Sequence, residues 1–331
     1  MILAVDGGNS KTDLALVDGD GRLLAALRGP TTSHQQIGFE PGIERMTGLV
    51  ADLRDRAGLE SDAPPARVGA FGLAGADTPG DTRRLTAALT ARGLAVDAFV
   101  VNDAFMPIRA GTENGWGVAL ICGQGVNAAG IAPDGRTARL AALGDISGDW
   151  GGGHDIGTAA LGAAVRARDA RGPRTGLEAL VPARFGVARP IDVTRRIEAG
   201  TLPHARLAEL SPVVFAAAGS GDAVARSILD RQADELIAMA RAIIVRLHLT
   251  RRAPTVVLAG GVFASRDATF DARVVDGIRA IAPGATVRRS EALPVMGAAL
   301  LGLDRTLGAH PRRHAAAVER LRESLGEWRP G

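Results

Sequence analysis

The chain has 331 residues, of which 46% are hydrophobic and 23% are charged, and this length and composition are typical of a globular protein with two domains. Its net charge is only +3, and the basic residues are interleaved with acids, so no basic stripe predicts a nucleic-acid partner. No apolar run reaches the roughly 18 residues of a membrane-spanning helix, and no secretion signal precedes the first strand, so we expect a cytoplasmic protein without a membrane partner.

The first third of the sequence alternates between strand and helix patterns. The turn at 18–21 contains Asp-Gly pairs between two apolar runs, which is typical of a β-hairpin. Periodicity predicts, in order, strands at 2–5, 14–17 and 22–27, a helix at 39–58, a strand at 68–73, a helix at 80–92 and a strand at 97–101. This order predicts a mixed sheet with crossover helices.

The arrangement of strand, glycine-rich loop and hairpin recurs at 118–121, 126–132 and 136–140. Further along, we expect mostly helix over 153–249, a strand at 255–259, a helix from about 267, a short strand near 286, and helices at 294–300 and 310–327. The expected fold class is α/β, with duplicated mixed β-sheets and helices on both sides. The expected domains are 1–113 and 114–308, followed by a helical segment, 309–331, that either packs back on the first domain or extends as a tail.

The first glycine-rich loop carries the donors that a phosphate group needs. Glycines let backbone N–H groups approach phosphate oxygens closely, and hydroxyl and ammonium groups add further donors. The expected phosphate-binding residues of this loop are Gly7, Gly8, Asn9, Ser10, Lys11 and Thr12. Asp6, at the end of the preceding strand, is the expected Mg²⁺ ligand, through water. The residue order differs from a P-loop, and a plain hairpin turn is the alternative.

Two later segments have similar glycine-rich turns. Residues 123–127 include Gly123, Gln124, Gly125 and Asn127, and a strand follows them where a dinucleotide-binding fold would begin a helix. They therefore predict a second phosphate loop. The strand at 255–259 ends in Gly260 and Gly261, where paired glycines leave room for adenine or its ribose. A tight strand-to-helix turn is the alternative for this last pair.

Asn102 and Asp103 follow the apolar strand at 97–101. A carboxylate at such a strand end faces the crevice where α/β sheets bind ligands. Kinases place an aspartate where it accepts the proton of the attacking hydroxyl group. Asp103 is therefore the candidate catalytic base, and a helix N-cap is the alternative role.

Together these segments resemble the sugar kinase, heat-shock chaperone and actin superfamily. Within it they are similar to the BadF/BadG/BcrA/BcrD ATPase family, which includes the N-acetylglucosamine kinases; the resemblance covers residues 1–305. It implies a two-domain actin-like (ribonuclease H-like) ATPase fold with an interdomain cleft, a homodimer, and ATP and Mg²⁺ as cofactors. It also implies an enzyme that transfers the γ-phosphoryl group of ATP to a hydroxyl, expected to be the 6-OH, of N-acetylglucosamine or a close relative.

The same resemblance implies where the sugar substrate binds. Segment 29–34 is similar to a sugar-contacting Gly-Pro-x-x-Asn segment, with Ser33 where asparagine is usual, and 72–77 resembles the next sugar-side loop. The expected substrate-binding residues are Thr32, Ser33, His34, Gly75, Ala76, Asn102, Asp145 and Trp150. For His34 the alternative is an exposed loop histidine, and for Trp150 it is a core side chain.

The sequence departs from this family after Asp145, where the usual glutamate is missing. A Gly-Trp-Gly segment that usually precedes it is replaced by residues 137–140, which include Arg139. Arg139 either binds a charged or carboxylated sugar or ends a hairpin and points to solvent. The departure concerns the identity of the sugar and not the kinase chemistry.

Other functions are found among relatives of these kinases. One is an ATPase that activates a radical dehydratase and carries a cluster on paired cysteines, but Cys122 is the only cysteine of this chain. Another is a sugar sensor that binds without turnover, but no helix-turn-helix pattern precedes the first strand. A BadF-type activator or sensor is nevertheless kept as the alternative function.

Overall fold

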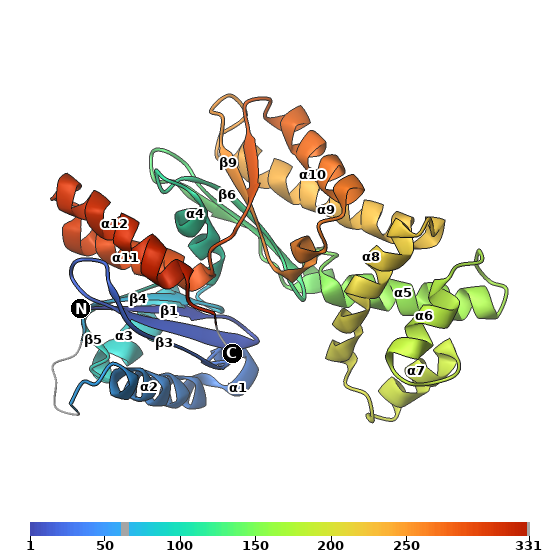
Figure 1. Cartoon of the computed structure of the whole chain (residues 1–331), viewed down its shortest axis with the longest axis horizontal. Helices are drawn as coiled ribbons and strands as arrows, with labels where there is room; N and C mark the ends of the chain where they lie inside the picture. The colour runs from blue at the N-terminus through green and yellow to red at the C-terminus, as the bar shows by residue number, and fades with distance from the viewer. Residues whose placement is uncertain (61–65, 330–331) are drawn as a thin grey trace. The chain divides into compact units, whose positions relative to one another are not determined.

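The computed structural model describes residues 1–60 and 66–329, and the chain divides into two compact units (Figure 1). The first unit contains Met1–Trp116 together with Ser290–Gly331, and the second contains Gly117–Arg289. Among the described residues, no helix has the length and apolar character needed to cross a bilayer. Each unit is described separately below.

The first unit is built on a five-stranded mixed sheet with the order β3-β2-β1-β4-β5. Its strands are β1 (Ile2–Gly7), β2 (Lys11–Val17), β3 (Leu23–Pro30), β4 (Ala66–Leu73) and β5 (Ala95–Asn102). The first three strands form an antiparallel meander, and β4 and β5 run parallel to β1. Because β1, β4 and β5 are parallel, their carboxyl ends meet at one edge of the sheet, where ligands of α/β proteins usually bind.

Helices cover both faces of this sheet. The helical elements of the first unit are α1 (His34–Ile37), α2 (Phe39–Arg56), α3 (Pro79–Ala91), η1 (Asp103–Phe105), α4 (Met106–Gly111), α11 (Pro294–Leu307) and α12 (Pro311–Gly326). One apolar core lies between the sheet and α2 and α3, and the other lies between the sheet and α4, α11 and α12. Strand residues alternate between the two cores, as the period of two in a β-strand requires.

The second unit repeats this sheet, with the order β10-β9-β6-β7-β8. Its strands are β6 (Gly117–Cys122), β7 (Val126–Ile131), β8 (Thr137–Arg139), β9 (Thr255–Ala259) and β10 (Thr286–Arg289). An antiparallel meander is again extended by two parallel strands, so β6 corresponds to β1 and β9 corresponds to β4. The duplication expected from the repeated hairpins is therefore present.

In the sequence, most helices of the second unit come after its three-stranded meander and before β9. They are α5 (Gly153–Arg168), α6 (Leu177–Arg184), α7 (Pro190–Glu198), η3 (His204–Leu210), α8 (Ser211–Gly219), α9 (Ala223–Arg246), η4 (Gly261–Ser265) and α10 (Ala268–Ile281). The longest, α9, packs on β6 and β7. Asp222 caps α9 by accepting hydrogen bonds from the N–H groups of Val224 and Ala225.

The C-terminal helices belong to the first compact unit. Helix α11 packs on β1 and α4, and α12 packs on α11 and β3. Ala317 of α12 touches the β2–β3 turn so closely that a Cβ added to Gly21 would lie 2.0 Å from its carbonyl oxygen. The domain limits at 113/114 and 308/309 stay a prediction. The division into compact units places residues 290–329 in the same unit as the N-terminal sheet.

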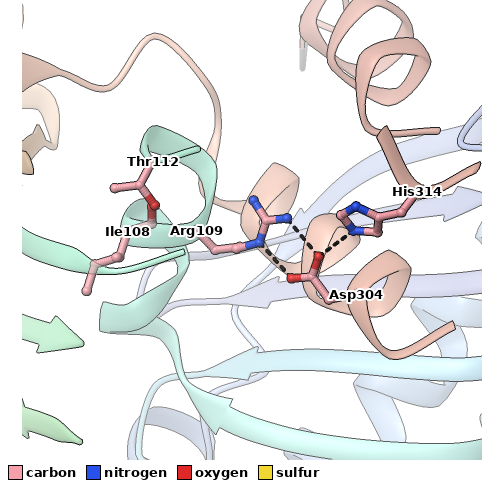
Figure 2. Close-up of polar contacts among 5 residues, drawn as sticks. All are labelled: Ile108, Arg109, Thr112, Asp304 and His314. Atoms are coloured by element: carbon pink, nitrogen blue, oxygen red, sulfur yellow. Dashed lines mark hydrogen bonds and ion pairs between the residues drawn. The ribbon is translucent and has the colours of Figure 1, made fainter. Parts of the chain in front are cut away.

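Helix α4 follows η1, which begins at Asp103, and is held to α11 by an ion pair between the buried Arg109 and the half-buried Asp304 (Figure 2). Arg109 is only 7% exposed, and its Nε and Nη2 each donate to a carboxylate oxygen of Asp304 at 2.7 Å. His314 of α12 places Nε2 2.7 Å from Oδ1 of the same carboxylate. A Cβ on Gly297 would lie 2.2 Å from the carbonyl oxygen of Met106, so α11 and α4 touch at the backbone.

Replacing Asp304 with asparagine should destabilise the first unit in a pH-dependent way. Burial alone would raise the pKa of Asp304, but hydrogen bonds from Arg109 and His314 outweigh burial and lower it. The stabilisation is therefore present above the unfolded-state pKa of about 4 and is lost as the pH falls through the folded-state value. At pH 7 we expect Asp304→Asn to lower the free energy of unfolding by about 2–3 kcal/mol, because Arg109 stays buried without a charged partner.

Urea denaturation of the two proteins at several pH values measures this difference. The matched control is Asp234→Asn, which breaks a two-bonded but exposed pair with Arg273 and should cost less than about 1 kcal/mol. Equal losses for the two variants, or a difference that persists unchanged at pH 3, would contradict the assignment.

Candidate active site

The first glycine loop joins β1 to β2 at the carboxyl end of β1. The Gly8 N–H donates to the Lys11 carbonyl at 3.0 Å, which closes the loop, and Asn9 and Ser10 at its tip are exposed. A Cβ at Gly7 would lie 2.7 Å from a methyl carbon of Leu73, so a side chain there would require Leu73 to move. The loop therefore presents backbone and side-chain donors outward, as a phosphate site requires.

Asp6 lies at the end of a row of charged residues that crosses three strands. Its cross-strand partner is Asp13 on β2, and the partner of Asp13 is Arg28 on β3. Directly paired residues of antiparallel strands project from the same face. Arg28 donates from Nε and Nη2 to the two Asp13 oxygens at 2.6 and 2.7 Å, and Nζ of Lys11 is 3.6 Å from Asp13. Arg28 thus pairs with Asp13 and not with Asp6.

The Asp6 carboxylate is buried in a site of negative potential. It is 9% exposed, and within the described part of the chain it has no hydrogen-bond or ion-pair partner. Burial raises its pKa well above the usual range, the Asp103 and Asp13 carboxylates raise it further, and Lys11 and Arg28 oppose them. A divalent cation would supply the missing positive charge, so the donor set fits Mg²⁺.

No cluster of three or more His, Cys, Asp or Glu side chains that could hold a metal exists in residues 1–60 and 66–329.

Asn102 and Asp103 lie at the same edge of the sheet as Asp6. In the register of the parallel strands, Gly7 pairs with Leu73 and Leu73 pairs with Asn102. Asn102 is the residue that caps η1, because its Oδ1 accepts from the Ala104 N–H at 3.1 Å. Asp103 is the first residue of η1 and is half-buried. The N-cap role considered for this pair thus belongs to Asn102.

The other sugar-side residues of the first unit lie in loops near this edge. Thr32 and Ser33 are buried, whereas His34 is half-buried. The His34 ring covers Gly75, where a Cβ would lie 2.4 Å from its Cε1. The side-chain amide of Asn102 donates to Asp77 at 2.9 Å and to the carbonyl of Ala76, itself buried, at 3.4 Å. The structure therefore brings segments 32–34, 75–77 and 102–103 together.

In the second unit, the second glycine loop and the adenosine-side glycines are neighbours. The loop links β6 to β7 and is closed by a 2.9 Å hydrogen bond from the Gly123 N–H to the Gly125 carbonyl. Gly260, at the end of the adjacent parallel strand β9, has a φ of +105°. A Cβ there would lie 2.4 Å from the Cys122 carbonyl oxygen, so a side chain would displace the loop. Next to it, Gly261 borders open space.

The amino terminus of α5 is hydrogen-bonded to this second loop. Gly153 and His154 donate their N–H groups to the carbonyls of Gly123 and Gln124 at 2.8 and 2.9 Å. Gly152 donates to Oε1 of Gln232, a fully buried side chain of α9, at 2.6 Å. These contacts link parts of the sequence that are up to 80 residues apart.

The remaining predicted residues of the second unit are more scattered. Asn127 accepts from the Ala128 N–H at 2.8 Å, and Asp145 is exposed in the short helix η2 (Gly144–Ser147). Trp150 stacks on Arg231, whose guanidinium carbon is 3.9 Å from the ring centroid. Arg139 ends β8 and donates to the Leu140 carbonyl at 3.0 Å.

Residues 3–302 match the BadF/BadG/BcrA/BcrD ATPase family, which is nearly the whole chain. The chain belongs to this family. Its members are ATPases by description, and the two glycine-rich loops, residues 102–103 and residues 260–261 all fall within the matched range. The family resemblance expected from those segments is confirmed.

Curated relatives of this BadF-family chain include two kinases. An N-acetyl-D-glucosamine kinase from Dictyostelium discoideum is 26% identical, over 92% of this chain and 98% of the relative. An N-acetylmuramic acid/N-acetylglucosamine kinase from Clostridium acetobutylicum is 29% identical, over 82% of this chain and 88% of the relative.

The solved structures establish the fold of this BadF-family chain. A Chromobacterium violaceum protein, named as a candidate N-acetylglucosamine kinase, matches with a TM-score of 0.71 and 23% identity, over 91% of this chain and 98% of that one. Together with the two duplicated mixed sheets, this match confirms the predicted α/β actin-like ATPase fold.

Some candidate site residues of this BadF-family protein were not predicted from the sequence. They are Asp13, Arg28, Gly152 and Gln232. Asp13 directly precedes the apolar residues 14–17 of β2, and the register set by the 18–21 turn places it opposite Arg28, so the sequence contained a signal for this pair. The contact between Gly152 and Gln232 depends on tertiary packing and had none.

Replacing Asp6 with asparagine should stabilise the nucleotide-free protein while removing its function. The folded-state pKa of Asp6 lies above the unfolded-state value, so its ionisation opposes folding increasingly as the pH rises through the folded-state value. At pH 8 we expect Asp6→Asn to be more stable by about 1–2 kcal/mol, and the difference to vanish below about pH 4.

Thermal unfolding without nucleotide at pH 4 to 8 measures the effect. Asp13→Asn, one strand away on the same face, is the matched control: it breaks the pair with Arg28 and should cost about 3 kcal/mol. An Asp6→Asn protein less stable than wild type at pH 8 would show that the buried carboxylate is not a source of strain.

Proposed function

We propose that this protein is an ATP-dependent sugar kinase, which transfers the γ-phosphoryl group of ATP to a hydroxyl of an amino sugar. Membership of an ATPase family and two relatives named as kinases of N-acetylated amino sugars support the phosphotransfer reaction. The observation that carries the proposal is the pair Asp6 and Asp103, two carboxylates close enough to influence each other at the carboxyl ends of β1 and β5. In this proposal Asp6 would hold the metal ion that accompanies the phosphates, and Asp103 accepts the proton of the sugar hydroxyl.

Each unit carries a glycine loop that we propose binds phosphate. The exposed tip of the first loop and the backbone N–H group of Gly125 donate to phosphate oxygens, while the Gly123 N–H closes the second loop. Lys11, the only lysine of the chain, adds a positive charge to the first loop. The open space beside Gly261 leaves room for adenosine.

The chemical step is an in-line displacement at the γ-phosphorus. Asp103 accepts the proton of the sugar hydroxyl as its oxygen attacks the γ-phosphorus, and the bond from that phosphorus to the bridging oxygen breaks to release ADP. Asp103 is suited to this role because Asn102 performs the capping and its amide holds the adjacent loop 76–77. Asp6 would hold Mg²⁺, which would neutralise negative charge on the phosphate oxygens.

The acceptor is N-acetylglucosamine or a close relative, and the 6-OH is the proposed site of phosphorylation. One curated relative is named for N-acetylmuramic acid as well, a sugar that carries a carboxylate. Thr32, Ser33, His34, Gly75, Ala76, Asn102, Asp145 and Trp150 stay predictions for the sugar site, and so does a role for Arg139.

Replacing Asp103 with asparagine tests the proposed base. In wild type we expect ADP release from Mg·ATP to be stimulated by N-acetylglucosamine or N-acetylmuramic acid, and little by glucose. Asp103→Asn should lower kcat by about 10²- to 10⁴-fold, with nucleotide affinity unchanged within a factor of about three, because a general base acts in the transition state.

A coupled ADP assay gives kcat, and calorimetry with a non-hydrolysable ATP analogue gives the affinity. Asp97→Asn on the same strand β5 is the matched control, since Asp97 makes only an exposed pair with Arg305. Near-normal turnover in Asp103→Asn would contradict the assignment of Asp103 as the general base.

Lys11 allows a test of the first loop that needs no turnover. It is the only lysine, and its side chain is 45% exposed, so an amine-acetylating reagent reaches it. Mg·ATP at ten times its dissociation constant should slow acetylation of Lys11 by about tenfold. Peptide mass spectrometry measures this rate, and the amino-terminal amine is the internal control. Equal rates with and without nucleotide would place the phosphates elsewhere.

The alternative is a BadF-type ATPase that acts as an activator or sugar sensor. An activator would need paired, ionised cysteines, but Cys122 is the only one, it is buried in β6, and burial raises its pKa to about 12. A sensor would bind the sugar without forming a sugar phosphate. A homodimer and a cytoplasmic location stay predictions, and sedimentation analysis of the purified chain tests the first.

A further inference from the structure

Segment 31–33, which follows β3, is hydrogen-bonded to the first glycine loop at two successive residues. The Thr31 hydroxyl donates to the Gly8 carbonyl at 2.8 Å, and the Ser33 hydroxyl donates to Oδ1 of Asn9 at 2.7 Å. Ser33 is 3% exposed, whereas Asn9 is exposed at the tip of the loop. The buried Ser33 hydroxyl therefore fixes the orientation of the exposed Asn9 side-chain amide.

The same segment also holds the far side of the loop. The Thr32 N–H donates to the Thr12 hydroxyl at 3.1 Å, and the two threonine hydroxyls lie 3.0 Å apart. Both threonines are buried. The Thr31 hydroxyl also accepts from the Ser33 N–H at 3.0 Å, which fixes the position of the serine itself. The loop is thus supported on both sides of its exposed tip.

The contact with Ser33 determines which end of the Asn9 side chain is available to a ligand. A side-chain amide has an acceptor oxygen and a donor NH₂ group. Because Oδ1 is occupied by the Ser33 hydroxyl, the Nδ2 group is left for an external partner. It lies in the loop of Ser10 and Lys11, whose side chains also donate hydrogen bonds. An acceptor-only, anionic ligand suits such a set of donors.

We propose that Ser33 is a positioning residue for the nucleotide, which orients the Asn9 amide so that its NH₂ group donates to a polyphosphate oxygen. This inference rests on the proposed function only in that the first loop binds phosphate. It gives Ser33 a role on the nucleotide side, in place of the sugar contact implied by the sequence resemblance. Ser33 acts through Asn9 and touches no reacting atom.

Calorimetry of the full chain with Mg²⁺ and the non-hydrolysable analogue AMPPNP tests the inference. Ser33→Ala should weaken AMPPNP binding by about tenfold, because the amide loses its fixed orientation. Asn9→Ala should weaken it at least as much. The double variant should be no weaker than Asn9→Ala alone, because the two residues act as one unit. Additive losses would overturn the inference.

Two further measurements separate positioning from a general structural effect. Ser33→Ala leaves no buried group unpaired, since Asn9 is exposed, so its melting temperature should stay within a few degrees of wild type. Ser33→Thr keeps the hydroxyl and should restore affinity. Ser227→Ala is the matched control: this exposed serine of α9 bonds only the Val224 carbonyl of its own helix, and affinity should not change.

The sugar readout distinguishes this inference from the proposed function. If the wild type binds AMPPNP but phosphorylates no sugar, the kinase proposal fails and the Ser33 result still decides the inference. If Ser33→Ala binds AMPPNP like wild type but shows a raised KM for the sugar, Ser33 contacts the sugar and the inference is overturned. A wild type that does not bind AMPPNP overturns both.

Discussion

The buried carboxylate of Asp6 is the constraint on which the first unit depends. Successive residues of β1 face the two cores in turn, which places Asp6 on the face that α4 and α11 cover, near Asp13 and Asp103. Arg28 pairs with Asp13 through two hydrogen bonds, and Lys11 lies 3.6 Å from the same carboxylate, so both nearby positive charges are engaged by Asp13. The folded protein therefore holds unbalanced negative charge at the carboxyl ends of its parallel strands. Such a site lowers the stability of the free protein, and under the proposed function a bound cation–phosphate complex would offset this cost.

Each unit has a glycine-rich turn in which backbone groups are accessible to a ligand. A meander turns through glycines at the end of its first strand, and a neighbouring parallel strand ends beside it. At Gly260 a side chain would collide with the backbone of the adjacent loop, so packing requires glycine there, whereas at Gly7 a side chain would require Leu73 to move. Residues outside the loops then fix their shape: Thr31 and Ser33 in the first unit, and Gly153 and Gln232 in the second.

Local sequence pattern predicted most strands, the long helices and all glycine loops, because these depend on periodicity and turn chemistry over a few residues. It also predicted that Asp103 follows a strand end, although only the structure shows that Asn102 supplies the cap. Contacts between distant segments could not be predicted. Arg109 and Asp304 are separated by 195 positions, and nothing in either segment indicates its partner. The Asp13–Arg28 pair is intermediate, since the register of one hairpin would have revealed it.

The family contains ATPases, and a fold alone does not decide between a kinase and a sensor. The most direct test of the kinase account is therefore the identity of the phosphorylated product. Phosphorus NMR of the protein incubated with Mg·ATP and N-acetylglucosamine follows the fate of the γ-phosphoryl group. The account predicts a sugar phosphate monoester, coupled to the protons on C6, formed in equal amount with ADP. Inorganic phosphate and ADP without any sugar phosphate, with this sugar and with N-acetylmuramic acid, would contradict it.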